Sequence, residues 1–151
     1  MSSISDPSYT VPWAELVAGT PDAVIYADRE GTIRVWNDGA AALFGFSAAE
    51  ALGQNLDLII PERLRAAHWA GFDRAMETGT TKGGREVRVT RGLHKDGRRL
   101  YVEMSFGVAL DARSGKAVGS VAMARDGTER YLASRAALAT PGATPAPAAD
   151  R

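Results

Sequence analysis

The sequence predicts an α+β domain in which helices cover one face of a five-stranded antiparallel sheet. Two short strand-like segments open the chain, a helical middle follows, and three longer strand-like segments close it. In the closing segment over 98–110, apolar residues occupy alternate positions, so one face of the sheet is apolar. The helical middle is the part of the chain that can cover this face. We therefore expect a cup whose interior lies between the sheet and the helices.

The first two strands are predicted over 23–28 and 33–36. The earlier one is an apolar run of strand length, and the later one alternates apolar and polar residues. The turn-rich residues 29–32 between them predict a hairpin. A short helix is expected ahead of the hairpin, because Pro12 suits a first helical turn and Gly19 is a typical helix stop.

Two short helices are predicted after the hairpin. Asn37 or Asp38 can cap the first of them, and Gly45 ends it. Ser47 and Glu50 have the spacing of a capping box, which marks the start of the second.

The longest predicted helix begins at Pro61 and ends before Gly79. Its apolar residues recur at intervals of four and three, so they form one stripe along the helix. We expect this stripe to face the interior of the cup. Its members are Leu64, His68, Phe72, and Ala75 or Met76.

The closing strands are predicted over 86–94, 98–110 and 117–126, with turns at 95–97 and 111–116. The middle strand supplies the apolar face of the sheet. Its residues on that face are Leu100, Val102, Met104, Phe106, Val108 and Leu110.

At 151 residues the chain has room for one domain. We expect a flexible N-terminal arm over 1–10, the domain over 11–131, and a disordered Ala/Pro-rich tail over 132–151.

The composition argues against several classes of function. Lys plus Arg and Asp plus Glu are 18 each, so the net charge of zero favours neither a nucleic acid nor a membrane surface as partner. The chain has no cysteine, which removes disulfides, thiolate metal sites and cysteine nucleophiles. No apolar stretch is long enough for a membrane span, and the polar N-terminus lacks a secretory pattern. We expect a cytoplasmic protein.

The sequence contains no recognisable catalytic residues. Its carboxylates are scattered over turns and helix surfaces, and Gly83-Gly84 precedes a strand rather than a phosphate-binding helix. We therefore expect no enzyme activity. A basic stretch lies in and around the second hairpin, and the balanced net charge favours a solvated strand face over a nucleic-acid site. Its members are Arg85, Arg88, Arg91, Lys95, Arg98 and Arg99.

Several short segments match a known pattern in order and spacing. They are Asp28–Ile33, Trp36-Asn37, Leu43–Ser47 with Glu50 and Gly53, His94–Arg98, and Arg125–Arg130. Through them the chain resembles a PAS domain from about residue 11 to residue 130. In many PAS domains the last segment leads into a signalling helix. Gly127 stands where that family usually has a bulky apolar residue, which weakens the expectation of a stiff helix here.

The resemblance implies a sensory or regulatory module that binds a small ligand or cofactor in its pocket. It also implies signalling through protein contacts, with a homodimer or a separate signalling protein as the partner. We expect Trp13 and the first helix to contribute to a homodimer contact. The alternative is a cofactor-free PAS domain that serves protein interaction and dimerisation and whose pocket is empty and collapsed.

The segment over 61–68 resembles the stretch that bears the proximal histidine in oxygen-sensing haem-PAS domains of histidine kinases. This resemblance implies haem b with His68 as the ligand of the iron, Arg88 near the bound gas or a propionate, and Arg74 near a propionate. The light-sensing flavin subfamily needs a cysteine that this chain lacks, so flavin is disfavoured. The expected apolar walls of the pocket are Leu64, Phe72, Val102, Met104 and Phe106.

Two observations support other interpretations of these residues. A lone histidine on a helix face is commonly a hydrogen-bonded packing residue, and His68 has no second histidine beside it, because His94 lies next to an exposed turn. By strand parity, Arg88 shares its face with Thr90, while Val87 and Val89 share the other. If the two valines face inward, Arg88 points to solvent.

Overall fold

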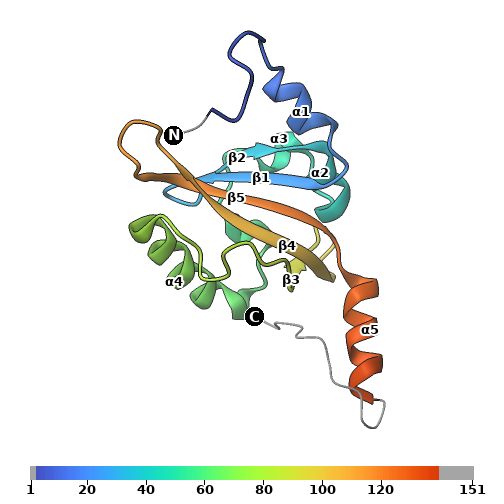
Figure 1. The fold of residues 1–151 in the computed structure, drawn as a ribbon. Coiled ribbons are helices and arrows are strands. Elements are labelled where there is room, and N and C mark those ends of the chain that lie inside the picture. Colours follow the sequence, from blue (N-terminus) through green and yellow to red (C-terminus); the bar gives the residue numbers. More distant parts are fainter. Residues whose placement is uncertain (1–2, 140–151) are drawn as a thin grey trace.

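The computed structural model describes residues 3–139 and confirms the predicted α+β fold. Five strands form one antiparallel sheet that crosses the centre of the molecule, with helices packed around it (Figure 1). The N-terminal arm, from residue 3 to residue 10, contains bends and turns and no regular helix or strand. Within residues 3–139, no helix is long and apolar enough to cross a lipid bilayer.

The N-terminal hairpin has the predicted bounds. Strand β1 covers Ala23–Asp28 and strand β2 covers Ile33–Trp36, paired antiparallel. Helix α1, Trp13–Gly19, precedes them. None of its residues is buried.

The two short helices are capped as their sequences predict. Helix α2, Asp38–Phe44, has Asn37 as its N-cap and ends at Gly45, whose φ of 82° is left-handed. Helix α3, Ala48–Ala51, begins with the full capping box at Ser47. Local side-chain chemistry therefore determines these two starts.

The long helix α4 covers Glu62–Thr78, with Pro61 in the N-cap position rather than in the first turn. Gly79, at a φ of 73°, closes it. A 3-10 turn, η1, at Leu56–Ile59 precedes α4 and was not predicted. It has no periodic apolar pattern of its own, because it is only one turn long.

The closing strands are β3 at Arg88–Leu93, β4 at Arg99–Leu110 and β5 at Ala117–Asp126. Strand β3 starts two residues later than predicted, because residues 82–85 form turns. The sheet order is β2-β1-β5-β4-β3. The first strand of the chain, β1, therefore pairs directly with the last strand, β5.

The core lies between the inner face of this sheet and the helices α2, η1 and α4. Its largest fully buried side chains are Phe44, Ile33 and Val102. Met104 of β4 is also buried, while Phe106 is 43% exposed. Among the alternating residues of β4, Val102 and Met104 near the middle of the strand are buried, while Phe106 and Leu110 are exposed.

The C-terminal residues differ from the prediction. Helix α5 covers Thr128–Ala139 and projects from the end of β5 (Figure 1), so residues 132–139 of the predicted disordered tail are helical. Residues 140–151, the rest of that tail, lie outside the described residues. The expectation from Gly127 was also wrong. A Cβ there would lie 2.7 Å from the backbone nitrogen of Glu103, so glycine lets the chain pass close to β4 before the helix begins.

Helix α5 touches the outer face of β4 and has no buried residue. The rings of Tyr131 and Tyr101 stack at a centroid distance of 3.7 Å and an angle of 10°. Arg130 Nη1 also donates to Glu103 Oε1 at 2.8 Å. These side chains attach the first turn of the helix to β4, and Arg135 and Leu138 further along the helix border a groove with Val89.

Helix α4 is anchored to the β1–β2 turn by Trp69. The Trp69 indole lies so close to Gly31 that a Cβ at position 31 would overlap the ring. The indole Nε1 donates a hydrogen bond to Asp57 Oδ1 at 2.8 Å, which links the helix to η1 as well. The Trp69 ring can therefore hold α4 in this position only because residue 31 has no side chain.

Replacing Gly31 by alanine should destabilise the protein strongly. Gly31 has a φ of 80°, where a Cβ costs about 1–2 kcal/mol. Overpacking against Trp69 should add about 1–3 kcal/mol. We expect the free energy of unfolding, measured by urea denaturation, to fall by about 2–5 kcal/mol.

Gly53→Ala is the matched control for this substitution. Gly53 has a similar φ of 85°, but nothing lies within 4 Å of a Cβ built there. Its alanine variant should lose only the backbone contribution of about 1–2 kcal/mol. Equal losses in the two variants would contradict the role given to Trp69.

Candidate ligand-binding site

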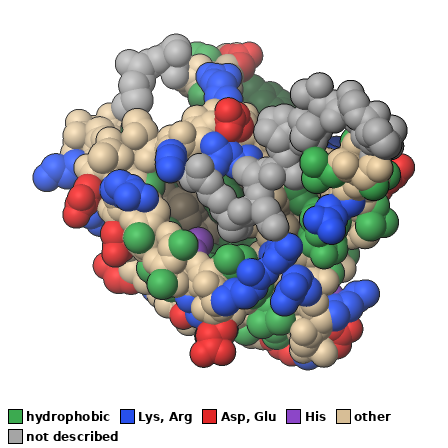
Figure 2. Space-filling view, turned by 90° about the horizontal axis from the view of Figure 1, so that it is seen from below, with side chains coloured by type: hydrophobic (Ala, Val, Ile, Leu, Met, Phe, Trp, Pro, Cys, Tyr) green, Lys and Arg blue, Asp and Glu red, His purple; other side chains and the backbone are tan. Residues whose placement is uncertain are grey.

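A cavity of about 380 Å³ lies between α4 and the inner faces of β3, β4 and β5. This volume falls within the range of about 300–1,000 Å³ that is typical of small-molecule sites. On the helix side, Ala67, Gly71 and Ala75 leave room because their side chains are small. Figure 2 shows the face of the molecule on which a hollow opens among hydrophobic and basic side chains.

All but one of the predicted cofactor-binding residues border this cavity. Arg74 is the exception, because its side chain is exposed and does not line the cavity. It follows His68 by six positions, which is about 600° of helix rotation, so it cannot share the stripe of His68. The residues that the structure does bring together are Leu64, His68, Phe72, Arg88, Val102, Met104 and Phe106.

Arg88 faces the cavity, and the two valines beside it do not. The register pairs Arg88 with Met104 and thereby places both on the inner face of the sheet. Val89 is only 5% exposed, yet it faces outward and borders a groove with Tyr101 and residues of α5. Val87 is 47% exposed. The two valines therefore do not face inward, so the condition under which Arg88 would point to solvent is not met; Val89 is buried because α5 covers the outer face there.

His68 lies on the cavity wall between two aromatic side chains. Its ring makes an edge contact with Trp69 at a centroid distance of 4.8 Å and a tilted contact with Phe72 at 6.1 Å. Its Nδ1 atom is fully buried, and no group among residues 3–139 hydrogen-bonds to it. Packing therefore orients the imidazole, and the hydrogen bond expected of a purely structural histidine is absent from the described part of the chain.

Burial lowers the pKa of the His68 imidazole below its ordinary value, because a buried charged ring is poorly solvated. The nearby negative charge of Asp57 raises this pKa, but to a smaller extent. The net effect favours the neutral ring, which is the form that can bind a metal or accept a hydrogen bond.

Arg88 forms an ion pair with Glu86, two residues earlier. Both Nε and Nη2 of Arg88 donate to Glu86 Oε2, at 3.1 and 2.7 Å. The Arg88 side chain is 27% exposed and that of Glu86 is 67% exposed. The guanidinium group also lies against Gly83, where a Cβ would be 3.3 Å from its carbon.

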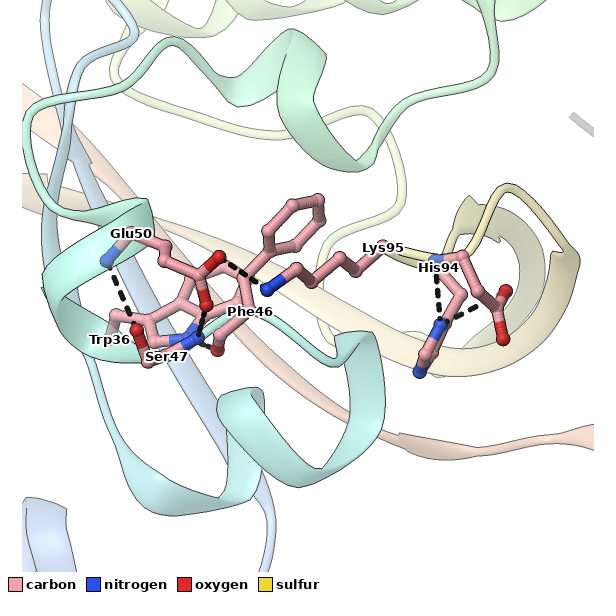
Figure 3. A network of polar contacts seen from close by, with 7 residues as sticks. Trp36, Phe46, Ser47, Glu50, His94 and Lys95 are labelled. Atoms are coloured by element: carbon pink, nitrogen blue, oxygen red, sulfur yellow. Dashed lines mark hydrogen bonds and ion pairs between the residues drawn. The ribbon is translucent and has the colours of Figure 1, made fainter.

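A polar network joins the β3–β4 turn to α2 and α3 (Figure 3). The Lys95 ammonium pairs with Glu50, and the Lys95 backbone N–H donates to the Phe44 carbonyl at 2.9 Å. The hydrogen bond from Lys95 is the main reason that the pKa of Glu50 is lowered to about 2. The turn is thus fixed beside Phe44, which lines the cavity.

His94 belongs to the same turn and was predicted to be exposed. Its side chain is only 16% exposed, because the imidazole packs against Gly45. Its Nδ1 accepts a hydrogen bond from the backbone of Asp96 at 3.1 Å. Sequence reasoning missed this network. The Lys95–Glu50 spacing of 45 residues gives no local signal for it.

Neither histidine belongs to a multi-residue metal site within residues 3–139. There, no group of three or more His, Asp or Glu side chains could hold a metal ion. A single imidazole on an apolar wall instead suits a cofactor that brings its own metal, or an organic ligand.

Comparison with known proteins gives a family match over most of the chain. A family model described as the PAS fold matches residues 17–132. The sensor protein FixL of Bradyrhizobium diazoefficiens is 33% identical over 87 residues, which are 58% of this chain and 17% of FixL. The chain therefore corresponds to a small part of that relative.

Solved structures support the same fold. A PAS domain from Colwellia psychrerythraea has a TM-score of 0.67 at 26% identity, covering 78% of this chain and 96% of that one. An RNA-binding light-oxygen-voltage receptor has a TM-score of 0.64 at 20% identity, covering 91% of this chain and 42% of that one. The latter likeness concerns the fold alone.

The lowered pKa of His68 should make stability depend on pH. As pH falls through about 6.5, the unfolded chain protonates His68 while the folded protein does not, so the folded state is destabilised. Above this range the contribution is fully present. We expect the Tm of the protein to fall more steeply between about pH 7 and pH 5.5 than that of His68→Gln. Parallel Tm curves for the two proteins would contradict the burial of a neutral imidazole.

Proposed function

This chain belongs to the PAS fold family, and we propose that it is a sensory module that binds a small ligand or cofactor in the cavity beside His68. The observation that carries the proposal is the buried, unpaired Nδ1 atom of His68 on the wall of an apolar cavity. A buried polar group without a partner costs about 1–3 kcal/mol. The neutral imidazole also borders the cavity, so a bound ligand would contact this ring.

Haem b is the candidate cofactor that would use this imidazole. The match to FixL and the resemblance of residues 61–68 to haem-PAS kinases support it. The donor set fits, because one imidazole lies on an apolar wall and the cations Lys82 and Arg88 border the same cavity, but the cavity of about 380 Å³ would have to widen to admit a porphyrin ring. When bound at His68, haem iron would supply a redox-active centre that accepts gas ligands.

The chain's own residues would have distinct roles at such a site. His68 would hold the iron, oriented by its packing between Trp69 and Phe72. Val102 and Met104, both buried on β4, would keep water from the opposite wall. Arg88 would place a positive charge at the side of the cavity.

The module would act by binding rather than by catalysis, and we place it in the cytoplasm. A ligand would shift the balance between two conformations only by its difference in affinity for them. The signal would leave through contacts with a second copy of the chain or with a separate signalling protein.

A cofactor-free interaction domain is the second candidate function. The feature that favours it is α1, where Trp13 is 50% exposed and Leu16 is 54% exposed. An apolar helix surface of this kind is typical of a protein contact. On this alternative, His68 would be a packing residue and the cavity would hold only solvent.

Addition of hemin to the purified protein distinguishes the two candidates. We expect an intense Soret absorption band that is lost in His68→Ala, because the axial imidazole is removed. His94→Ala is the matched control and should keep the band, because His94 packs against Gly45 and does not line the cavity. Absence of hemin uptake, or equal uptake by both variants, would contradict haem ligation by His68.

Deletion of residues 1–20 should weaken self-association. The deletion removes α1 with its exposed Trp13 and Leu16, and we propose that these form part of a homodimer contact. Sedimentation velocity at several concentrations measures the effect. Deletion of residues 140–151 is the control and should leave association unchanged. An unchanged association constant in the first deletion would remove α1 from the contact.

A further inference from the structure

Among residues 3–139, the charged side chains that border the cavity do not balance one another. Within the described residues, its charged border consists of Lys82, Glu86, Arg88 and Arg91. The guanidinium carbon of Arg91 lies 5.9 Å from the ring centroid of Tyr101, on the outer face of the sheet. Two cations therefore oppose one carboxylate at the cavity. A ligand with one negative charge would neutralise the remaining positive charge at the cavity.

The Arg88–Glu86 ion pair is asymmetric in its exposure. The Arg88 side chain is 27% exposed and lies on the cavity wall, whereas Glu86 is 67% exposed. Water can solvate the Glu86 carboxylate alone, but it reaches the Arg88 guanidinium less well. The arginine therefore depends on an anionic partner more than the glutamate depends on its cation.

Neighbouring backbone restricts the position of the Arg88 guanidinium group. The backbone at Gly83 lies against it, and a Cβ there would be 3.3 Å from both Cζ and Nη2. Arg88 is also paired in register with Met104, a buried residue of the cavity wall. The donor group is thus held where apolar surface and solvent meet.

We propose that the cavity binds a small amphipathic carboxylic acid whose carboxylate replaces Glu86 as the partner of Arg88. Its apolar part would lie among Phe72, Met104 and Val108. The volume of about 380 Å³ equals about 13 water volumes, which suits a chain of about a dozen non-hydrogen atoms. This inference rests on the proposed function, because it requires a cavity that binds ligands.

Isothermal titration of the full chain with alkanoates of increasing length, and with alcohols of the same lengths, tests the inference. The wild type should bind the alkanoate at least about tenfold more tightly than its matched alcohol, as expected for a charge-assisted bidentate contact. Arg88→Met should abolish this preference and still bind the alcohol, which also shows that the variant is folded. Arg74→Met is the matched control and should keep the preference, because Arg74 is exposed and outside the cavity.

Glu86→Gln provides an independent variant. It removes the competing carboxylate, so alkanoate affinity should rise severalfold while alcohol affinity stays the same. Should Arg88→Met fail to fold, this rise remains a test of the exchange of partners. Unchanged alkanoate affinity in Glu86→Gln would overturn the exchange.

The outcomes separate this inference from the proposed function. Equal binding of alkanoate and alcohol would overturn the carboxylate assignment and leave the ligand-binding cavity in place. Binding of neither would overturn both. If alkanoates fail to bind while hemin retention depends on Arg88, the carboxylates concerned are the haem propionates, and a free acid is excluded.

Discussion

The contact of Trp69 with Gly31 and Asp57 determines where α4 lies, and with it the shape of the cavity. Successive helix residues differ by about 100° in direction. Trp69 therefore points to the β1–β2 turn while its neighbour His68 points to the cavity. The anchor and the candidate ligand residue are adjacent in the chain, so the position of one fixes the other. Small residues on the cavity side of the helix then leave the space open.

Much of this fold follows from local sequence signals. The bounds of β1, β2 and β5 match the apolar runs between turn residues, and Asn37 and Ser47 cap their helices as their side-chain chemistry demands. The alternation along β4 predicted the inner face of the sheet, and the stripe of α4 placed His68 and Phe72 on the cavity wall. Each of these features depends on residues close together in the sequence.

The features that the sequence did not predict depend on distant contacts. Gly127 was taken as a weak point for a helix, but its lack of a side chain is needed because β4 passes close by. An inward-facing Val89 would have turned Arg88 to solvent, but Val89 lies on the outer face, where α5 covers it. Arg74 was assigned by resemblance, and helix rotation excludes it from the cavity. For Gly127 and Val89 the missing information was which element packs against the other face, whereas the position of Arg74 follows from helix rotation alone.

Alternate residues of strand β4 face the cavity on one side of the sheet and helix α5 on the other. Val102 and Met104 border the cavity, while Tyr101 and Glu103 on the opposite face hold the first turn of α5. The cavity wall and the base of α5 are therefore formed by neighbouring residues of one strand. A small tilt or slide of this strand would reach the helix directly, without a relay of intervening side chains. The stacked rings of Tyr101 and Tyr131 would carry such a movement to the first turn of α5.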